Sequence, residues 1–190
     1  MNKLKIIDIS NKEFKGQQPS NLYFFNRMND YKLNCDKKSV FYSYIALKTL
    51  LKSLNIDLDQ IEIVLDKNGK PVFKDKSLRI HFNISHSHNL VVVAVSDHPI
   101  GIDVQKFSVP NHKIIKRYFN TYQQTMLKQT FNQTALYTKY WTVFESELKL
   151  FGDIQTKSTN TTEIYHKSKT LTDEHGNKYY LTISSTLKFK

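Results

Sequence analysis

Hydrophobic residues along the chain recur at two spacings, a short one typical of strands and a longer one typical of helices. Alternating or continuous apolar runs predict strands over residues 3–9, 61–65, 81–85, 90–96 and 100–105. From Asp36 to Leu54 the apolar residues are spaced as on one face of a helix. This stretch predicts an amphipathic helix in the first half of the chain.

Short polar or glycine-containing segments separate these elements. Residues 11–20 predict a loop or a weak helix start, and Lys67-Asn68-Gly69 predicts a turn. Residues 97–99 are few enough to join the strands on either side of them as an antiparallel hairpin. The pattern therefore predicts that strands 90–96 and 100–105 pair with each other.

The second half of the chain begins with helical spacing and ends in a polar tail. Helices are expected at about 111–130 and 134–151. Strands are expected near 161–166 and 178–189, joined by a turn at 174–177. No repeat of solenoid length is visible, and only a faint strand–helix–strand echo links the two halves.

Composition agrees with a folded protein of one domain or two small ones. The 190 residues are 39% hydrophobic and 13% aromatic. The longest apolar run, residues 90–95, is far shorter than the roughly 20 residues that a membrane helix needs. The N-terminus lacks the features of a signal peptide, and a single cysteine, Cys35, excludes an internal disulfide. We therefore expect a cytoplasmic protein without a membrane partner.

The net charge of +11 indicates an anionic partner: nucleic acid, a phosphate-rich cofactor or an acidic protein. The excess is nearly all lysine, scattered among many asparagines, as an AT-rich genome would also encode on a neutral surface. Scattered lysines without a recognition helix or a single-strand-binding motif argue against nucleic acid. Charge alone therefore does not choose the partner.

One candidate for chemistry is the carboxylate of Asp103. Residues two apart share a face of a strand, so Asp103 and Gln105 point together while Ile102 and Val104 point to the opposite side. An acid held between buried aliphatic residues is presented rigidly to a cleft. The alternative is a surface acid on a half-exposed hairpin.

A second candidate lies in the helix expected at 134–151. Trp141, Glu145 and Lys149 follow the spacing i, i+4, i+8 and form one stripe. Glu145 and Lys149 alone could be a stabilising ion pair on a solvated face. The tryptophan on the same stripe indicates instead that the stripe faces protein or a ligand.

Two further segments carry groups suited to binding phosphate. Ser85-His86-Ser87-His88, after the strand, offers hydroxyls, backbone N–H groups and imidazoles. A zinc site at His86 and His88 is the alternative, but further ligands are not evident nearby. The turn Asn68-Gly69-Lys70-Pro71 presents a lysine, and taken alone it is an ordinary turn.

In their order and spacing, these segments resemble a known family of enzymes. GKPVF (69–73), FNISHS (82–87), GIDVQ (101–105) and WTVFESELK (141–149), with Gly152, resemble the 4′-phosphopantetheinyl transferases of the surfactin-synthetase-activating type. Members of that family read approximately GKP, FNxSHS, GxDxE and WxxKExxxK. The match covers about residues 36–152 of this chain.

The resemblance implies a monomeric α+β fold of two similar α/β halves related by a pseudo-twofold axis, with coenzyme A in the cleft between them. The halves would be residues 1–98 and 99–190. The implied reaction moves 4′-phosphopantetheine from coenzyme A to a serine of an apo carrier protein and releases adenosine 3′,5′-bisphosphate. The alternative is a degenerate relative that binds coenzyme A or a carrier protein without efficient transfer.

The resemblance also implies roles for individual residues. Asp103 and Glu145 would bind Mg²⁺ with the coenzyme A diphosphate, and Gln105 would contribute weakly or through water. Glu145 would also act as general base, and Lys149 would neutralise phosphate. The residues implied for the rest of the cofactor are Ser85 and His86 (phosphate), Lys70 and Pro71 (adenine and 3′-phosphate), and Lys38 and Ser39 (phosphate).

Carrier proteins are acidic, so the positive charge would steer the encounter. The contact is expected near Arg117, Tyr118 and Phe119, which resemble an Arg-Phe-Phe segment of the family, and on the helix after them.

The sequence departs from the family pattern at several positions. Gln105 replaces a glutamate, Phe144 replaces the lysine of a Lys-Glu pair, and Gln123 stands where an acid often follows the Arg-Phe-Phe segment of the family. The tail after Lys149 is short for the family, so a terminal strand of the second half is expected to be missing. These departures allow a working enzyme with weaker Mg²⁺ binding, a slow enzyme, or a degenerate relative.

Overall fold

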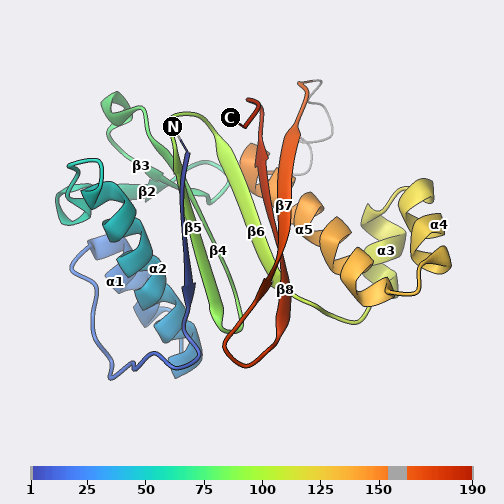
Figure 1. Ribbon diagram of the computed structural model, residues 1–190. Coiled ribbons are helices and arrows are strands. Elements are labelled where there is room, and N and C mark those ends of the chain that lie inside the picture. Colours follow the sequence, from blue (N-terminus) through green and yellow to red (C-terminus); the bar gives the residue numbers. More distant parts are fainter. Residues whose placement is uncertain (1, 154–161, 190) are drawn as a thin grey trace.

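The protein consists of two three-stranded antiparallel sheets packed between helices (Figure 1). The computed structural model describes residues 2–153 and 162–189. The first sheet has the order β1 (Asn2–Asp8), β5 (Leu90–Ser96), β4 (His81–Ser87). The second has the order β6 (Ile100–Lys106), β8 (Lys178–Ser185), β7 (Tyr165–Thr172). The expected α+β class with two sheet-containing halves is confirmed.

Each half contains one long helix of 19 residues that covers its sheet. These helices are α2 (Asn34–Lys52) in the first half and α5 (Gln133–Phe151) in the second. The shorter helices are α1 (Leu22–Asn29), α3 (His112–Tyr118) and α4 (Thr121–Gln129). The remaining elements are a ribbon of β2 (Ile63–Leu65) and β3 (Pro71–Phe73) and the 3₁₀ turns η1 (Leu58–Gln60) and η2 (Lys76–Leu78). Among the described residues, no helix combines the length and hydropathy that crossing a membrane requires.

Strand β5 is buried along its whole length, which explains its uninterrupted apolar sequence. Val91, Val93 and Val95 face the core under α2. Leu90, Val92 and Ala94 alternate with them and pack against the second sheet in an apolar core that both sheets share. The two halves are therefore joined through a common hydrophobic interior.

The predicted hairpin between strands 90–96 and 100–105 is wrong. Both edges of β5 are occupied, one by β1 and the other by β4, in continuous antiparallel registers. Strand β6 has no edge of β5 to join, so it leaves the first sheet after residues 97–99 and pairs with β8. The acid at position 103 thus lies on a strand of the second sheet and not on a hairpin arm.

The helix predicted at 111–130 is two helices, and α1 was not predicted. The break follows Phe119, which is extended and buried, and Asn120 then caps α4 in a reciprocal capping box with Gln123. In α1, Asn21 caps the first turn, and Phe24 and Met28, four residues apart, supply the buried face. Of the predicted strand 161–166, residue 161 lies outside the described residues, and β7 begins at Tyr165.

Candidate active site

Side chains of β4 hold the free edge of β6. Asn83 Oδ1 accepts a hydrogen bond from Ile102 N at 3.0 Å, and Ser85 Oγ accepts one from Val104 N at 3.1 Å. Ser87 Oγ does the same for the backbone N–H of residue 106, at 3.1 Å. These three residues alternate along β4, so they point to one face, toward the second half. We call this row the polar seam.

Asp103 is buried where the polar seam meets α5. Its Oδ1 accepts hydrogen bonds from Ser85 Oγ at 2.9 Å and from Lys149 Nζ at 2.8 Å. Lys149 Nζ also donates to Ser85 Oγ at 3.0 Å. The structure therefore brings together one residue from each of three predicted motifs, which are separated by up to 64 positions in sequence.

A glycine allows α5 to approach β6 closely enough for this contact. A Cβ atom on Gly101 would lie 1.9 Å from Ser146 O and 2.6 Å from Leu150 N. No side chain fits in that space, so the glycine of the GIDVQ motif sets the distance between strand and helix. Asp103, two residues further on the same face, then reaches Lys149.

The second oxygen of Asp103 is available for a ligand. Oδ2 is buried, and within residues 2–153 and 162–189 it has no hydrogen-bond partner. A buried carboxylate oxygen without a partner is costly, and Mg²⁺ prefers oxygen donors such as carboxylates and amides. Asp103, Glu145 and Gln105 supply donors of that kind, so their chemistry fits the ion.

Glu145 lies one helical turn before Lys149 on α5 and is half-buried. On the same helix, Trp141 and Phe144 stack on each other with ring centroids 5.4 Å apart. Tyr118 contacts both rings, at 5.9 and 4.7 Å. Trp141, the aromatic residue of the stripe expected to face protein or a ligand, thus packs against protein, and Phe144, at the family's lysine position, is part of this aromatic cluster.

The Ser-His-Ser segment is the end of strand β4 and not a turn after it. Consecutive residues of a strand point to opposite faces, so Ser85 faces β6 while His86 faces a cavity in the first half. His88 follows the strand, and its Nδ1 lies 3.3 Å from Ser87 Oγ. Within the described part of the chain, no group of three or more His, Cys, Asp or Glu side chains could hold a metal. The zinc alternative therefore has no support there.

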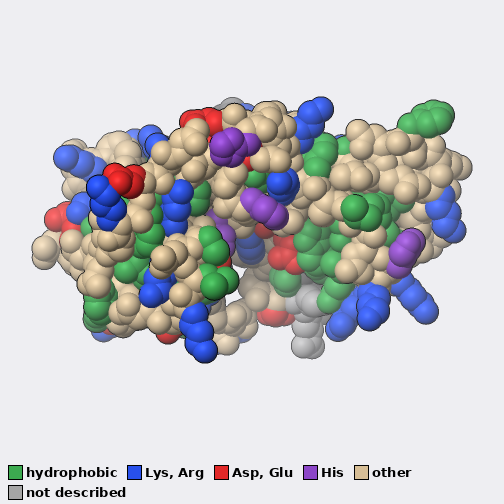
Figure 2. Space-filling model, turned by 90° about the horizontal axis from the view of Figure 1, so that it is seen from below, with side chains coloured by type: hydrophobic (Ala, Val, Ile, Leu, Met, Phe, Trp, Pro, Cys, Tyr) green, Lys and Arg blue, Asp and Glu red, His purple; other side chains and the backbone are tan. Residues whose placement is uncertain are grey.

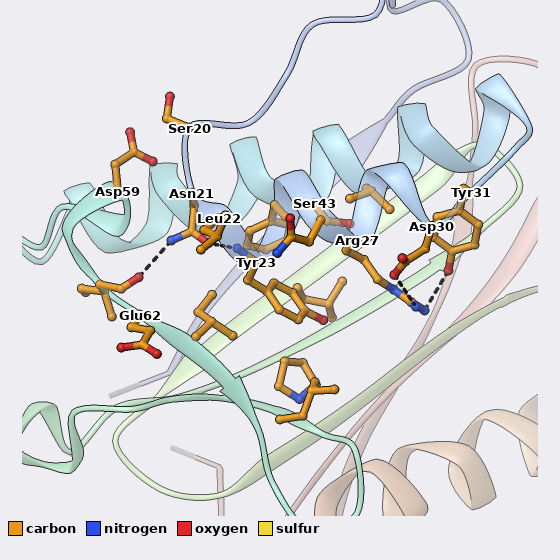
Figure 3. A pocket seen from close by; sticks show the side chains of 18 of the residues that line it. Ser20, Asn21, Leu22, Tyr23, Arg27, Asp30, Tyr31, Ser43, Asp59 and Glu62 are labelled. Carbon is orange, nitrogen blue, oxygen red and sulfur yellow. Dashed lines mark hydrogen bonds and ion pairs between the residues drawn. The ribbon is translucent and has the colours of Figure 1, made fainter.

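The cavity beside His86 has a volume of about 780 Å³ and lies between α1, α2, the β2–β3 ribbon and β4 (Figure 3). Two predicted cofactor residues, Pro71 and His86, line it. Arg27, which was not predicted, also lines it; its guanidinium donates to Tyr31 Oη at 2.9 Å and lies 3.8 Å from Asp30. Helix α1 forms this wall of the cavity. In the sequence it could have been predicted from Asn21, a helix-capping residue, and from the apolar residues Phe24 and Met28, which are four positions apart.

Burial lowers the pKa of His86, and the cations Lys149 and Arg27 lower it further, while Asp36 and Asp103 oppose them. The lowered pKa favours the neutral form of the ring in the free protein. A neutral imidazole in a cavity gains a proton readily when an anion binds beside it. This electrostatic state suits a phosphate-containing ligand.

Other predicted cofactor residues lie elsewhere. Ser39 is buried and its hydroxyl donates to Cys35 O within α2 at 3.1 Å. Lys38 is half-buried on the same helix, and neither residue lines the cavity. The Lys70 ammonium points away from the cavity and donates to Lys149 O at 2.7 Å. Burial lowers the pKa of Lys70 to about 8, although Asp66 opposes the shift.

The three residues expected to meet a carrier protein differ in exposure. Arg117 is exposed, and its guanidinium carbon lies over the ring of Tyr118 at 5.2 Å from the centroid. Phe119 is buried, 5% exposed, against Tyr137 and Tyr140. Phe119 therefore supports this surface from beneath.

Comparison with known proteins identifies the family of the chain. Residues 25–98 match a family model described as "4′-phosphopantetheinyl transferase, N-terminal", and residues 99–187 match one described as "4′-phosphopantetheinyl transferase superfamily". The chain therefore belongs to the 4′-phosphopantetheinyl transferase superfamily. The similarity to its surfactin-activating type, expected from the motifs, is confirmed by the relatives that follow.

The chain is 37% identical over 117 residues to 4′-phosphopantetheinyl transferase gsp of Aneurinibacillus migulanus, covering 60% of this chain and 48% of that protein. It is 33% identical over 110 residues to 4′-phosphopantetheinyl transferase Sfp of Bacillus subtilis, covering 57% and 49%. A mouse L-aminoadipate-semialdehyde dehydrogenase-phosphopantetheinyl transferase is 29% identical over 133 residues, covering 62% and 43%. The chain thus spans about half the length of the curated relatives it matches.

Proposed function

We propose that this protein transfers the 4′-phosphopantetheine group of coenzyme A to a serine of an apo carrier protein. The observation that carries the proposal is the buried contact of Asp103 with Ser85 and Lys149. Three motifs that resemble those of the transferases meet at this contact, although they are far apart in the sequence. Membership of the 4′-phosphopantetheinyl transferase superfamily indicates which reaction such a site would catalyse.

We propose that residues 1–98 supply the coenzyme A side of the site and residues 99–190 the acidic side. The cavity lined by Pro71, His86 and Arg27 is large enough for the nucleotide part of the cofactor. Ser85 lies on the same strand as His86, but its hydroxyl faces the second half and donates to Asp103. Its proposed contact with a phosphate oxygen would therefore be made on that side. The protein would act as a monomer in the cytoplasm.

Phosphoryl transfer needs an in-line nucleophile and neutralised phosphate oxygens more than covalent help. Asp103 and Glu145 would hold Mg²⁺, with Gln105 contributing weakly or through water, and the bound ion would neutralise charge on the diphosphate. Lys149 donates two of its three N–H groups to Ser85 and Asp103. The third can donate to a phosphate oxygen.

Glu145 is the proposed general base. The carrier serine oxygen bonds to the β-phosphorus of coenzyme A, and the serine proton passes to the Glu145 carboxylate. The bond from that phosphorus to the bridging oxygen breaks, and adenosine 3′,5′-bisphosphate leaves with the electron pair. Arg117 and Tyr118 form the proposed contact with the acidic carrier protein, and nucleic acid is not a proposed partner.

Labelling of carrier proteins tests the proposal. The purified protein is incubated with a fluorescent coenzyme A conjugate, Mg²⁺ and several apo carrier proteins, and transfer is read as fluorescence and mass gain on the carrier serine. Glu145→Gln, which removes the base and one metal ligand, is expected to reduce the rate at least about 100-fold. The absence of labelling on every carrier would refute the enzymatic function.

The second candidate is a relative that binds coenzyme A without efficient transfer. Gln105 and Phe144 favour it, because each removes a charge that the family pattern places at the site. Calorimetry would detect coenzyme A binding in a protein that labels no carrier. That combination of results would select this candidate over the transferase.

A further inference from the structure

The turn that carries Lys70 lies between the two halves of the protein and sends side chains toward both. Asp66 closes the turn, since its backbone N–H donates to Lys70 O at 2.9 Å and its Oδ1 accepts from Lys70 N at 2.9 Å. Gly69 and Pro71 line the cavity of the first half. The side chain of Lys70 instead crosses to the second half, where its ammonium donates to Lys149 O at 2.7 Å and to Ile100 O at 3.4 Å.

These two carbonyls mark the ends of the elements that build the acidic site. Lys149 lies in the last turn of α5, whose final carbonyls lack helical donors and form the negative end of the helix dipole. Ile100 is the first residue of β6, the strand that carries Asp103. One ammonium therefore joins the end of α5 to the start of β6.

Neighbouring contacts hold the same turn against α5. Asn68 Nδ2 donates to Asp153 Oδ2 at 3.2 Å. Gly152 ends α5 in the left-handed region (φ 92°), and a Cβ atom there would lie 2.5 Å from Asn68 Nδ2. The turn thus contacts the helix end at Asn68 as well as at Lys70.

We propose that Lys70 is a positioning residue that sets α5 relative to β6, and that it is not a ligand of the coenzyme A 3′-phosphate. Its contact with the backbone of Lys149 fixes the residue whose side chain binds Asp103. The effect on turnover rests on the proposed transferase function. The effect on α5 does not, because it concerns the free protein.

Hydrogen exchange of the free protein tests the proposal independently of activity. Lys70→Met keeps the length of the side chain and removes its charge and donors, so both carbonyls lose a charge-assisted hydrogen bond. Amides at the end of α5, in a peptide covering residues 145–153, are expected to exchange at least about tenfold faster. Lys67→Met is the matched control, because Lys67 is exposed in the same turn and has no hydrogen-bond or ion-pair partner within the described residues. It is expected to leave exchange unchanged.

Transfer kinetics with coenzyme A and 3′-dephospho-coenzyme A distinguish positioning from phosphate binding. If Lys70 is a positioning residue, Lys70→Met should lower kcat by a similar factor for both substrates, and Lys70→Arg should restore part of the rate. If Lys70 is instead a ligand of the 3′-phosphate, Lys70→Met should raise KM for coenzyme A alone. Should Lys70→Met fail to fold, Lys70→Gln replaces it, with one donor and no charge.

Each outcome bears on the proposal. Faster exchange at the end of α5, with equal kinetic losses on the two substrates, supports it. Unchanged exchange overturns it whether or not the protein transfers phosphopantetheine, and a KM effect confined to coenzyme A overturns it as well. If the wild-type protein has no transferase activity but Lys70→Met still speeds exchange, the positioning role of Lys70 in the free protein is supported. Only the proposed function is then refuted.

Discussion

His86 and Ser85 are adjacent in sequence and serve opposite faces of β4, one the cavity and the other the polar seam. Burial and the cations Lys149 and Arg27 keep the pKa of His86 below its usual range. A phosphate bound beside the ring would raise that pKa, so binding takes up a proton. Coenzyme A affinity is therefore expected to rise as pH falls toward the lowered pKa of His86 in the free protein, and to level off below it.

Calorimetry in buffers of different ionisation enthalpy measures this proton uptake. His86→Gln is expected to make the affinity nearly independent of pH around that pKa, while His175→Gln, in the exposed β7–β8 turn, is expected to behave as wild type. Affinity of the wild-type protein that stays flat with pH would contradict the placement of phosphate at His86.

At the level of elements, the sequence predicted where strands lie better than which strands pair. The strands of the first sheet and β6 were located by their apolar patterns, and α2 and α5 by their helical spacing. Pairing failed at β5 and β6, because occupancy of the edges of β5 depends on β1, which is more than 80 residues away in sequence. The motif spacing found Asp103, Ser85 and Lys149, but it could not give the direction of Lys70 across the two halves.

The packing of β6 on α5 depends on Gly101. Its conformation is open to other residues, so an added methyl group acts through contact alone, against backbone atoms of Ser146 and Leu150. Backbone atoms of a helix cannot move aside as a side chain can. Gly101→Ala is expected to lower the free energy of unfolding by about 3 kcal/mol or more, which urea denaturation would measure.

Gly176→Ala provides the comparison, because an added Cβ meets no atom within 4 Å there, and the left-handed conformation (φ 80°) is the only cost. That cost is expected to be about 1–2 kcal/mol. Since Lys149 reaches Asp103 only when α5 lies close to β6, Gly101→Ala should also lose transfer activity. Stability equal to wild type in Gly101→Ala would contradict the close approach of β6 and α5.

Across the whole molecule, the halves are joined by the shared apolar core, the polar seam and the Lys70 contact. A large apolar contact between halves favours unfolding in one cooperative step. On the face seen in Figure 2, positive side chains occur over both halves, and several lie close together at the lower right of the view. Such a distribution suits general attraction of acidic partners.

The buried ammonium of Lys70 makes the stability of the whole protein depend on pH. Its pKa is about 8 in the folded state and 10.5 as the ordinary value. Between those values the unfolded chain binds more protons than the folded one, so the free energy of unfolding rises with pH. Relative to Lys70→Met, the wild-type free energy of unfolding should rise by up to about 3 kcal/mol between pH 8 and pH 10.5.

Taking the difference between the two proteins removes the contribution of groups common to both. Asp66, Lys76, Arg79 and His81 line the cavity of about 290 Å³ around Lys70, and Lys149 approaches from α5; all are present in both proteins. Urea denaturation at several pH values gives the two curves. A difference that stays flat or falls with pH would contradict the lowered pKa of Lys70 in the folded state.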